Sequence, residues 1–76
     1  TRYGVLAIVA GLVALARGRP DRAVAHQRQA LAIAAAHHPE AARRSYGYLV
    51  DALGRAGAIA EARTCFDEAM RLVPRS

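Results

Sequence analysis

Glycine and proline divide this chain into four stretches of helix-forming residues, and their spacing limits the fold more than any other feature. The breaks fall at Gly18 and Pro20, at Pro39, at Gly57 and at Pro74. Alanine, the strongest helix former, is abundant between these breaks, and β-branched residues are few. The pattern therefore predicts an all-α chain, with helices over about residues 3–17, 20–38, 40–55 and 59–73.

The second half of the chain repeats the layout of the first half. When Gly18 is placed over Gly57, the pair Ala30-Leu31 falls on Ala69-Met70, so one shift of the numbering aligns both features. Short connections make consecutive helices antiparallel, so each repeat is predicted to be a helical hairpin. We therefore expect one domain over residues 1–76, built from hairpins at about residues 3–38 and 40–74.

The second hairpin resembles a tetratricopeptide repeat. That family's pattern runs from an aromatic residue through large apolar and small positions to a glycine turn, and then through alanine, aromatic and alanine to a closing proline. Ala62 and Ala69 lie two turns apart on one face and allow a close approach of the facing helix, while larger residues, Phe66 included, are expected to fill the gaps between the helices. Val50 departs from the pattern, because Gly or Ala is usual there. The matching residues are Tyr46, Leu49 with Val50, Leu53, Gly57, Ala62, Phe66, Ala69 and Pro74.

The first hairpin is a weaker copy, with Ala7 in place of the aromatic residue and Gln27 opposite Phe66. Its second helix is longer, and the run that ends in two histidines and Pro39 is similar to the longer repeats of kinesin light chains and of bacterial signalling and regulatory proteins. The resemblance implies a right-handed α-solenoid of two stacked antiparallel hairpins that binds proteins and has no cofactor. The alternative is a pair of ordinary antiparallel hairpins in a helical bundle.

In tetratricopeptide proteins the first helix of each repeat lines a concave groove. By the resemblance, the predicted partner-binding residues are Arg44, Tyr48, Asp51 and Arg55. The first helix has apolar residues in its groove positions, so the Lys and Asn side chains with which chaperone-binding members hold a C-terminal carboxylate are missing. A simpler interpretation is that Arg44, Asp51 and Arg55 form a solvated face with one ion pair at i,i+4 spacing. The apolar groove positions are Val5, Ile8, Leu12 and Leu15.

Twelve consecutive residues from Val5 to Ala16 have no polar side chain. A helix that is apolar on all sides belongs in an interior, yet the first helix of a two-repeat stack has a neighbour on one side only. We therefore expect this helix to contact further repeats or a second copy of the chain. The last helix, by contrast, has the polar outer face expected of a terminal repeat, with Arg63, Asp67, Glu68 and Arg71. The predicted contact residues of the first helix are Val5, Ile8, Val9, Leu12 and Val13.

The same apolar run resembles the core of a signal peptide, with Ala14-Leu15-Ala16 as a cleavage site. Its continuation into Gly18 and Pro20, which belong to the repeat, favours a structural helix instead. The run is shorter than the roughly 20 residues that a membrane-spanning helix needs, so no membrane span is predicted. The single Cys65 cannot form an internal disulfide and favours a reducing, cytoplasmic compartment.

The net charge of +5 comes from eleven arginines and no lysine. The arginines are spread along the chain, and several have acidic neighbours at helical spacing, as in Asp51 with Arg55 and Asp67 with both Arg63 and Arg71. No basic stripe is interleaved with aromatic residues for base stacking. Direct nucleic-acid binding is therefore the weaker hypothesis.

The sequence offers no residue set typical of an enzyme or a metal site. His26, His37, His38 and Cys65 are the candidate metal ligands, and no pair has the spacing that metal sites use, although a site shared between two chains stays open. No nucleophile with a base and no Gly-rich phosphate loop are recognised. We therefore predict a module that binds a peptide or helix of a partner protein and is not an enzyme. The alternative is a sensor or oligomerisation segment of a larger bacterial transcriptional or signalling regulator.

Overall fold

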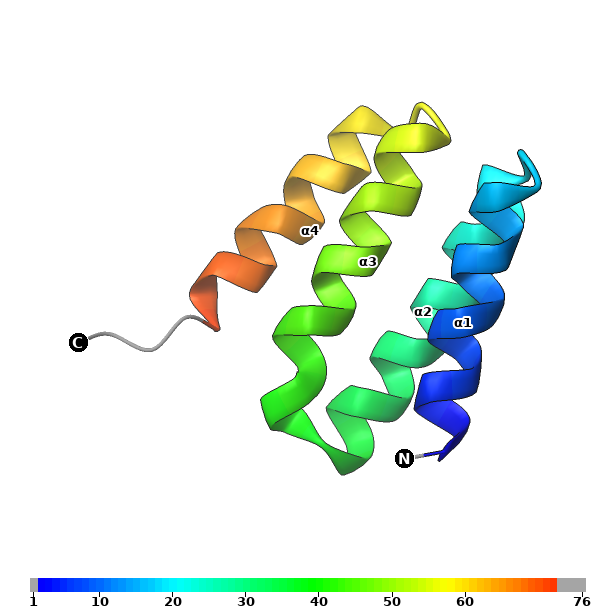
Figure 1. Ribbon diagram of the computed structural model, residues 1–76. Helices are drawn as coiled ribbons and strands as arrows, with labels where there is room; N and C mark the ends of the chain where they lie inside the picture. The colour runs from blue at the N-terminus through cyan, green and yellow to red at the C-terminus, as the bar shows by residue number, and fades with distance from the viewer. Residues whose placement is uncertain (1, 73–76) are drawn as a thin grey trace.

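The described part of the chain folds into four α-helices that follow one another as two hairpins (Figure 1). The structure, a computed structural model, describes residues 2–72. Across this range the chain forms helices and turns but no strand, which confirms the all-α prediction. The helices are α1 (Arg2–Ala16), α2 (Pro20–His37), α3 (Ala42–Arg55) and α4 (Ile59–Arg71), and a 3₁₀ turn, η1 (Pro39–Ala41), lies before α3.

The two hairpins close with the same backbone turn. Gly18 and Gly57 have positive φ angles of 71° and 83°, a conformation that a side chain disfavours. After each glycine the next amide bonds back to the last turn of the preceding helix: Arg19 N donates to Ala14 O at 2.9 Å, and Ala58 N to Leu53 O at 2.9 Å. This is the Schellman arrangement, in which a glycine ends a helix and its open carbonyls are satisfied. The identical turns support the internal repeat that places Gly18 over Gly57.

The connection between the hairpins differs from the prediction by a few residues. The third helix was expected from about Glu40, but Pro39 starts a 3₁₀ turn in which Ala41 N donates to His38 O at 2.8 Å. Proline has no amide hydrogen and disfavours helical geometry in the residue before it, so the chain turns before α3 begins. The predicted end of the fourth helix at Val73, and Pro74, lie outside the described residues; α4 ends at Arg71.

The core is thin because the helices form a slab with principal extents of 39 × 30 × 16 Å. Each helix packs against the next one in the chain, and α1 also touches α3. The large apolar side chains of the core are Leu49 and Leu53, which are 1% and 2% exposed. Alanines fill most of the remaining core. A chain of this length buries only about 60% of the surface that its unfolded form exposes, less than a larger domain does, so close alanine contacts take the place of a deep core. The buried alanines are Ala7, Ala14, Ala23, Ala30, Ala34, Ala42, Ala52 and Ala62.

One buried polar side chain links α1 to α2. Gln27 is completely buried, and its Nε2 donates to the backbone oxygen of Ile8 at 3.2 Å. Its Oε1 has no hydrogen-bond partner among the described residues. The amide fits because Gly11 has no side chain: a Cβ atom there would overlap Gln27 Nε2 and lie 2.8 Å from Gln27 Cδ. Gly11 is therefore needed for space, not for backbone conformation.

The environment of Phe66 corrects one expectation. Phe66 was predicted to fill a gap between helices, but 44% of its surface is exposed. The backbone of α4 packs against α3 alone among the described helices, so the other side of α4 faces solvent. In the first hairpin the equivalent residue, Gln27, is buried against α1, where its Nε2 donates to Ile8 O and its side chain fills the space beside Gly11. The equivalent positions of the two hairpins therefore differ in burial, although the repeat aligns them.

Candidate functional site

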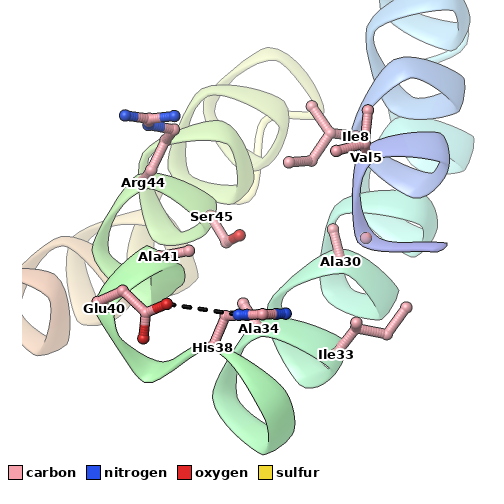
Figure 2. A pocket seen from close by; sticks show the side chains of 11 residues that line it. Val5, Ile8, Ala30, Ile33, Ala34, His38, Glu40, Ala41, Arg44 and Ser45 are labelled. Carbon is pink, nitrogen blue, oxygen red and sulfur yellow. Dashed lines mark ion pairs between the residues drawn. The ribbon is translucent and has the colours of Figure 1, made fainter. Parts of the chain in front are cut away.

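A cleft opens where α1, the last turns of α2 and the start of α3 meet (Figure 2). Its volume is about 270 Å³. α2 has 18 residues and its hairpin partner α1 has 15, and residues of the last turns of α2, Ile33 and Ala34, line the cleft. The lining residues are Gly4, Val5, Ile8, Ala30, Ile33, Ala34, His38, Glu40, Ala41, Arg44 and Ser45.

The two walls of the cleft differ in chemistry. Val5 and Ile8 of α1 form an apolar wall, and Figure 2 shows both side chains directed toward α3. Arg44 and Ser45 stand on the opposite wall, and the Ser45 hydroxyl points into the space between the helices. The small side chain of Ala34 keeps the floor open. The cleft therefore presents apolar surface beside a cation and a hydroxyl group.

One end of the cleft is closed by a charged pair. His38 Nδ1 lies 3.4 Å from Glu40 Oε1, an ion pair when the histidine is protonated (Figure 2). Both residues sit at the sharp connection that Pro39 imposes after α2. Their side chains are partly exposed, at 42% and 76%, so solvent screens this pair.

Arg44 is the charged group of the cleft that is left for a ligand, because it forms no ion pair with any residue in the described range 2–72. A second depression between α2 and α3 contains Arg28 and Tyr46, but both are already engaged. Arg28 forms an ion pair with Glu61 of α4, and Tyr46 Oη donates to Glu68 Oε2 at 3.1 Å. Burial, together with the hydrogen bond to Glu68, raises the pKa of Tyr46. The first cleft is therefore the better candidate site.

The structure brings together part of the predicted groove. Arg44 lines the cleft opposite Val5 and Ile8, which the resemblance had assigned to the same surface. Tyr48, Asp51 and Arg55 lie further along α3 and do not line this cleft. Asp51 and Arg55 form the expected i,i+4 ion pair, with Arg55 Nε 3.2 Å from Asp51 Oδ1. Among the described residues, Asp67 forms no ion pair with Arg63 or Arg71.

Sequence reasoning missed the floor and the closed end of the cleft. Ile33, Ala34, His38 and Glu40 were not predicted as site residues, although they line it. Their signal in the sequence was the extra length of the first repeat before Pro39, which was interpreted only as a longer helix.

The predicted contact face of α1 is largely exposed. Val5, Val9, Leu12 and Val13 are between 42% and 59% exposed, whereas Ile8 is half-buried in the cleft wall. Leu6, which was not predicted, is 57% exposed. Exposed apolar surface of this extent on a small domain is typical of a contact with another molecule.

The candidate metal ligands do not gather into a site. Within residues 2–72, no three His, Cys, Asp or Glu side chains are close enough to hold a metal ion. Cys65 is a half-buried free thiol, and burial and the nearby Glu68 carboxylate raise its pKa. In the same range no helix combines the length and the apolar character that crossing a bilayer requires.

Comparison with known proteins gives no relative. No protein-family model matches the chain, and no curated protein and no solved structure matches it significantly. The resemblance to tetratricopeptide repeats therefore rests on the residues of this chain and on its internal repeat.

Proposed function

We propose that this chain is a protein-binding module of the tetratricopeptide type, which holds a short peptide or helix of a partner protein in the cleft between α1 and α3. The observation that carries the proposal is the pairing of an open apolar floor with Arg44, which has no ion-pair partner of its own among the described residues. Protein sites for small ligand segments combine apolar lining with a few polar groups in this way.

The lining favours a particular kind of ligand. An aliphatic side chain fits between Ile8 and Ala34, where it is removed from water. A carboxylate next to that side chain can pair with Arg44, since guanidinium groups bind carboxylates through two parallel hydrogen bonds. Ser45 offers a further hydrogen bond. The expected ligand is therefore a segment with an aliphatic residue beside Asp, Glu or a chain terminus.

A peptide-display selection on the immobilised chain tests this function. We expect enrichment of peptides that have an aliphatic residue beside an acidic one, and loss of their binding to Arg44→Glu and to Val5→Asp. Both positions are exposed, so the substitutions leave the fold intact. The matched controls are Arg63→Glu on α4 and Val9→Asp on α1, which make the same chemical changes outside the cleft.

The outcome separates the cleft from other surfaces. Binding that survives Arg44→Glu and Val5→Asp, or that is lost equally in the two controls, would contradict a ligand in this cleft. If a large library yields no peptide above background, the proposed peptide-binding function is refuted.

A second function, as an oligomerisation segment, is supported by a different observation. The outer face of α1 exposes Leu6, Val9 and Val13 to solvent, and apolar side chains at such exposure are stabilised when a partner covers them. The concentration dependence of the molecular mass in sedimentation equilibrium is the direct measurement. A constant monomer mass up to millimolar concentration would exclude it.

A further inference from the structure

The internal repeat leaves two helix faces uncovered, one on α4 and one on α1. They correspond to the two sides of the contact between α2 and α3. In the complete interface, α3 packs over α2, and Leu31 and Val24 of α2 contact the cluster around Leu49 and Leu53. The shift that carries Gly18 onto Gly57 also maps α2 onto α4, and the reverse shift maps α3 onto α1. Each residue of α4 can therefore be compared with its equivalent in α2, and each residue of α1 with its equivalent in α3.

On α4, the positions that correspond to Gln27 and Leu31 of α2 are apolar and open, whereas the exposed Arg63 stands in the place of Val24. Phe66 corresponds to Gln27, and its exposed fraction is 44% where that of Gln27 is zero. Met70 corresponds to Leu31, which packs against the core, and Met70 is 55% exposed. Ile59 lies two turns before Phe66 on the same stripe and is 61% exposed. This stripe is the α4 face.

On α1, three positions that correspond to buried residues of α3 are also apolar and open, whereas Ala14, in the place of Leu53, is itself buried. Leu6 takes the place of Ser45, and Val13 takes the place of Ala52. Ser45 and Ala52 are 3% and 0% exposed, whereas Leu6 and Val13 are 57% and 43% exposed. Tyr3, in the place of the buried Ala42, is 73% exposed. Leu6, Val13 and Tyr3 are the α1 face.

The two faces are suited to each other in size as well as in character. In α3 a large Leu49 stands between the small Ser45 and Ala52. In α1 the arrangement is reversed, because a small Ala10 stands between the larger Leu6 and Val13. The large side chains of α1 therefore stand at different positions along the helix from those of α3, but both helices present large apolar side chains. Residues 3–16 include no charged side chain that would have to be removed from water.

We propose that the α4 face of one copy binds the α1 face of a second copy, so that the helices of successive chains continue the repeat. This inference deepens the oligomerisation function and rests on it. The template is the α2–α3 contact within the chain, which shows how a helix covers these positions. Because α1 and α4 lie on opposite sides of the row of helices and do not touch each other (Figure 1), the contact is head-to-tail and can extend beyond two copies.

Two charge variants test the direction of assembly. One carries Leu6→Glu and Val13→Glu and blocks the α1 face; the other carries Phe66→Glu and Met70→Glu and blocks the α4 face. All four residues are exposed, so both chains should retain wild-type helicity by circular dichroism. In sedimentation velocity from micromolar to millimolar concentration, we expect the wild type to form species of increasing size. Each variant alone should sediment as a single chain.

An equimolar mixture of the two variants gives the decisive result. Each variant keeps one intact face, so the mixture should form a species of two chains and no larger one. Controls with Leu12→Glu and with Thr64→Glu should assemble like the wild type. Leu12 corresponds to the exposed Asp51, and Thr64 is turned about 200° around α4 from Phe66.

Each other outcome overturns the inference in a distinguishable way. If the variant blocked at α4 still dimerises alone, the contact is symmetric through α1, and oligomerisation survives without the head-to-tail arrangement. If the variant blocked at α1 still dimerises alone, the symmetric contact is through α4. A wild type that stays monomeric at all concentrations would remove the oligomerisation function together with this inference. A mixture that stays monomeric, with an assembling wild type, would refute the pairing of the two faces.

Discussion

The contact between Gly11 and Gln27 gives the sharpest prediction about stability, through the substitution Gly11→Ala. In an open helix, alanine in place of glycine stabilises by about 1 kcal/mol. Here the new Cβ would overlap Gln27 Nε2 and lie 2.8 Å from Gln27 Cδ, closer than packed atoms come. The side chain of Gln27 is fully buried, so it cannot move away into solvent.

The expected change follows from the sum of three effects. Overpacking in a filled interior destabilises by about 1–3 kcal/mol. Loss of the hydrogen bond from Gln27 to the Ile8 oxygen, with the amide still buried, adds about 1–2 kcal/mol. After subtraction of the helix-propensity gain, we expect Gly11→Ala to lower the free energy of unfolding by about 1–4 kcal/mol. For a domain of this size the melting temperature then falls by on the order of 10 °C.

Urea denaturation followed by far-ultraviolet circular dichroism measures this change, and Gly47→Ala is the matched control. Gly47 is also inside a helix, but a Cβ there meets nothing within 4 Å, so the control should be stabilised by up to about 1 kcal/mol. In Gly11→Ala/Gln27→Ala the clash is removed, and the double variant should be less destabilised than the sum of the two single variants. The reasoning would be refuted if Gly11→Ala stabilised the chain as much as Gly47→Ala does.

Three further predictions concern the core, the link between α2 and α4, and pH. Leu49→Ala should lower the free energy of unfolding by about 2–5 kcal/mol in urea denaturation, because Leu49 is 1% exposed. Arg28→Ala should lower it by less than about 1 kcal/mol, with the difference lost at high salt, because the pair with Glu61 is solvent-exposed. Burial and Glu68 raise the pKa of Tyr46 in the folded state, so its stabilising contribution is complete at neutral pH. As the pH rises past the unfolded value of about 10 that contribution is lost, and Tyr46→Phe should reduce the fall in thermal midpoint there.

The helices could be predicted from sequence because their boundaries are local signals. Gly18 and Gly57 end helices through their own backbone conformation, and Pro20 fits the first turn of α2 whatever packs around it. Pro39 likewise determines the break before α3. These residues act within one turn of the chain, so the pattern alone locates them.

Burial was harder to predict, because it depends on which helix lies opposite. Phe66 has the character of a core residue and is exposed, while Gln27 has the character of a surface residue and is fully buried. Gln27 lies against α1 on a helix that packs against both α1 and α3, whereas α4 packs against α3 alone among the described helices. The space beside Gly11 that accepts Gln27 is also a property of two helices together.

The candidate site was predicted in part for the same reason. Arg44, Val5 and Ile8 could be assigned because the repeat places the first helix of each hairpin on one surface. The floor at Ile33 and Ala34 comes from the second helix of the first hairpin, and nothing in a pattern of first helices points to it.

The greater length of α2 has a consequence for what the cleft can recognise. α2 has 18 residues where the equivalent helix α4 has 13, and the five additional residues extend it by about 7.5 Å. An extended ligand advances by about 3.3 Å per residue. The added length of α2 can therefore contact about two residues of an extended ligand. A contact with so few ligand residues favours rapid dissociation and exchange between partners. In an assembly of several copies, each chain would add one such site, and a ligand that contacts several sites at once would bind with higher avidity.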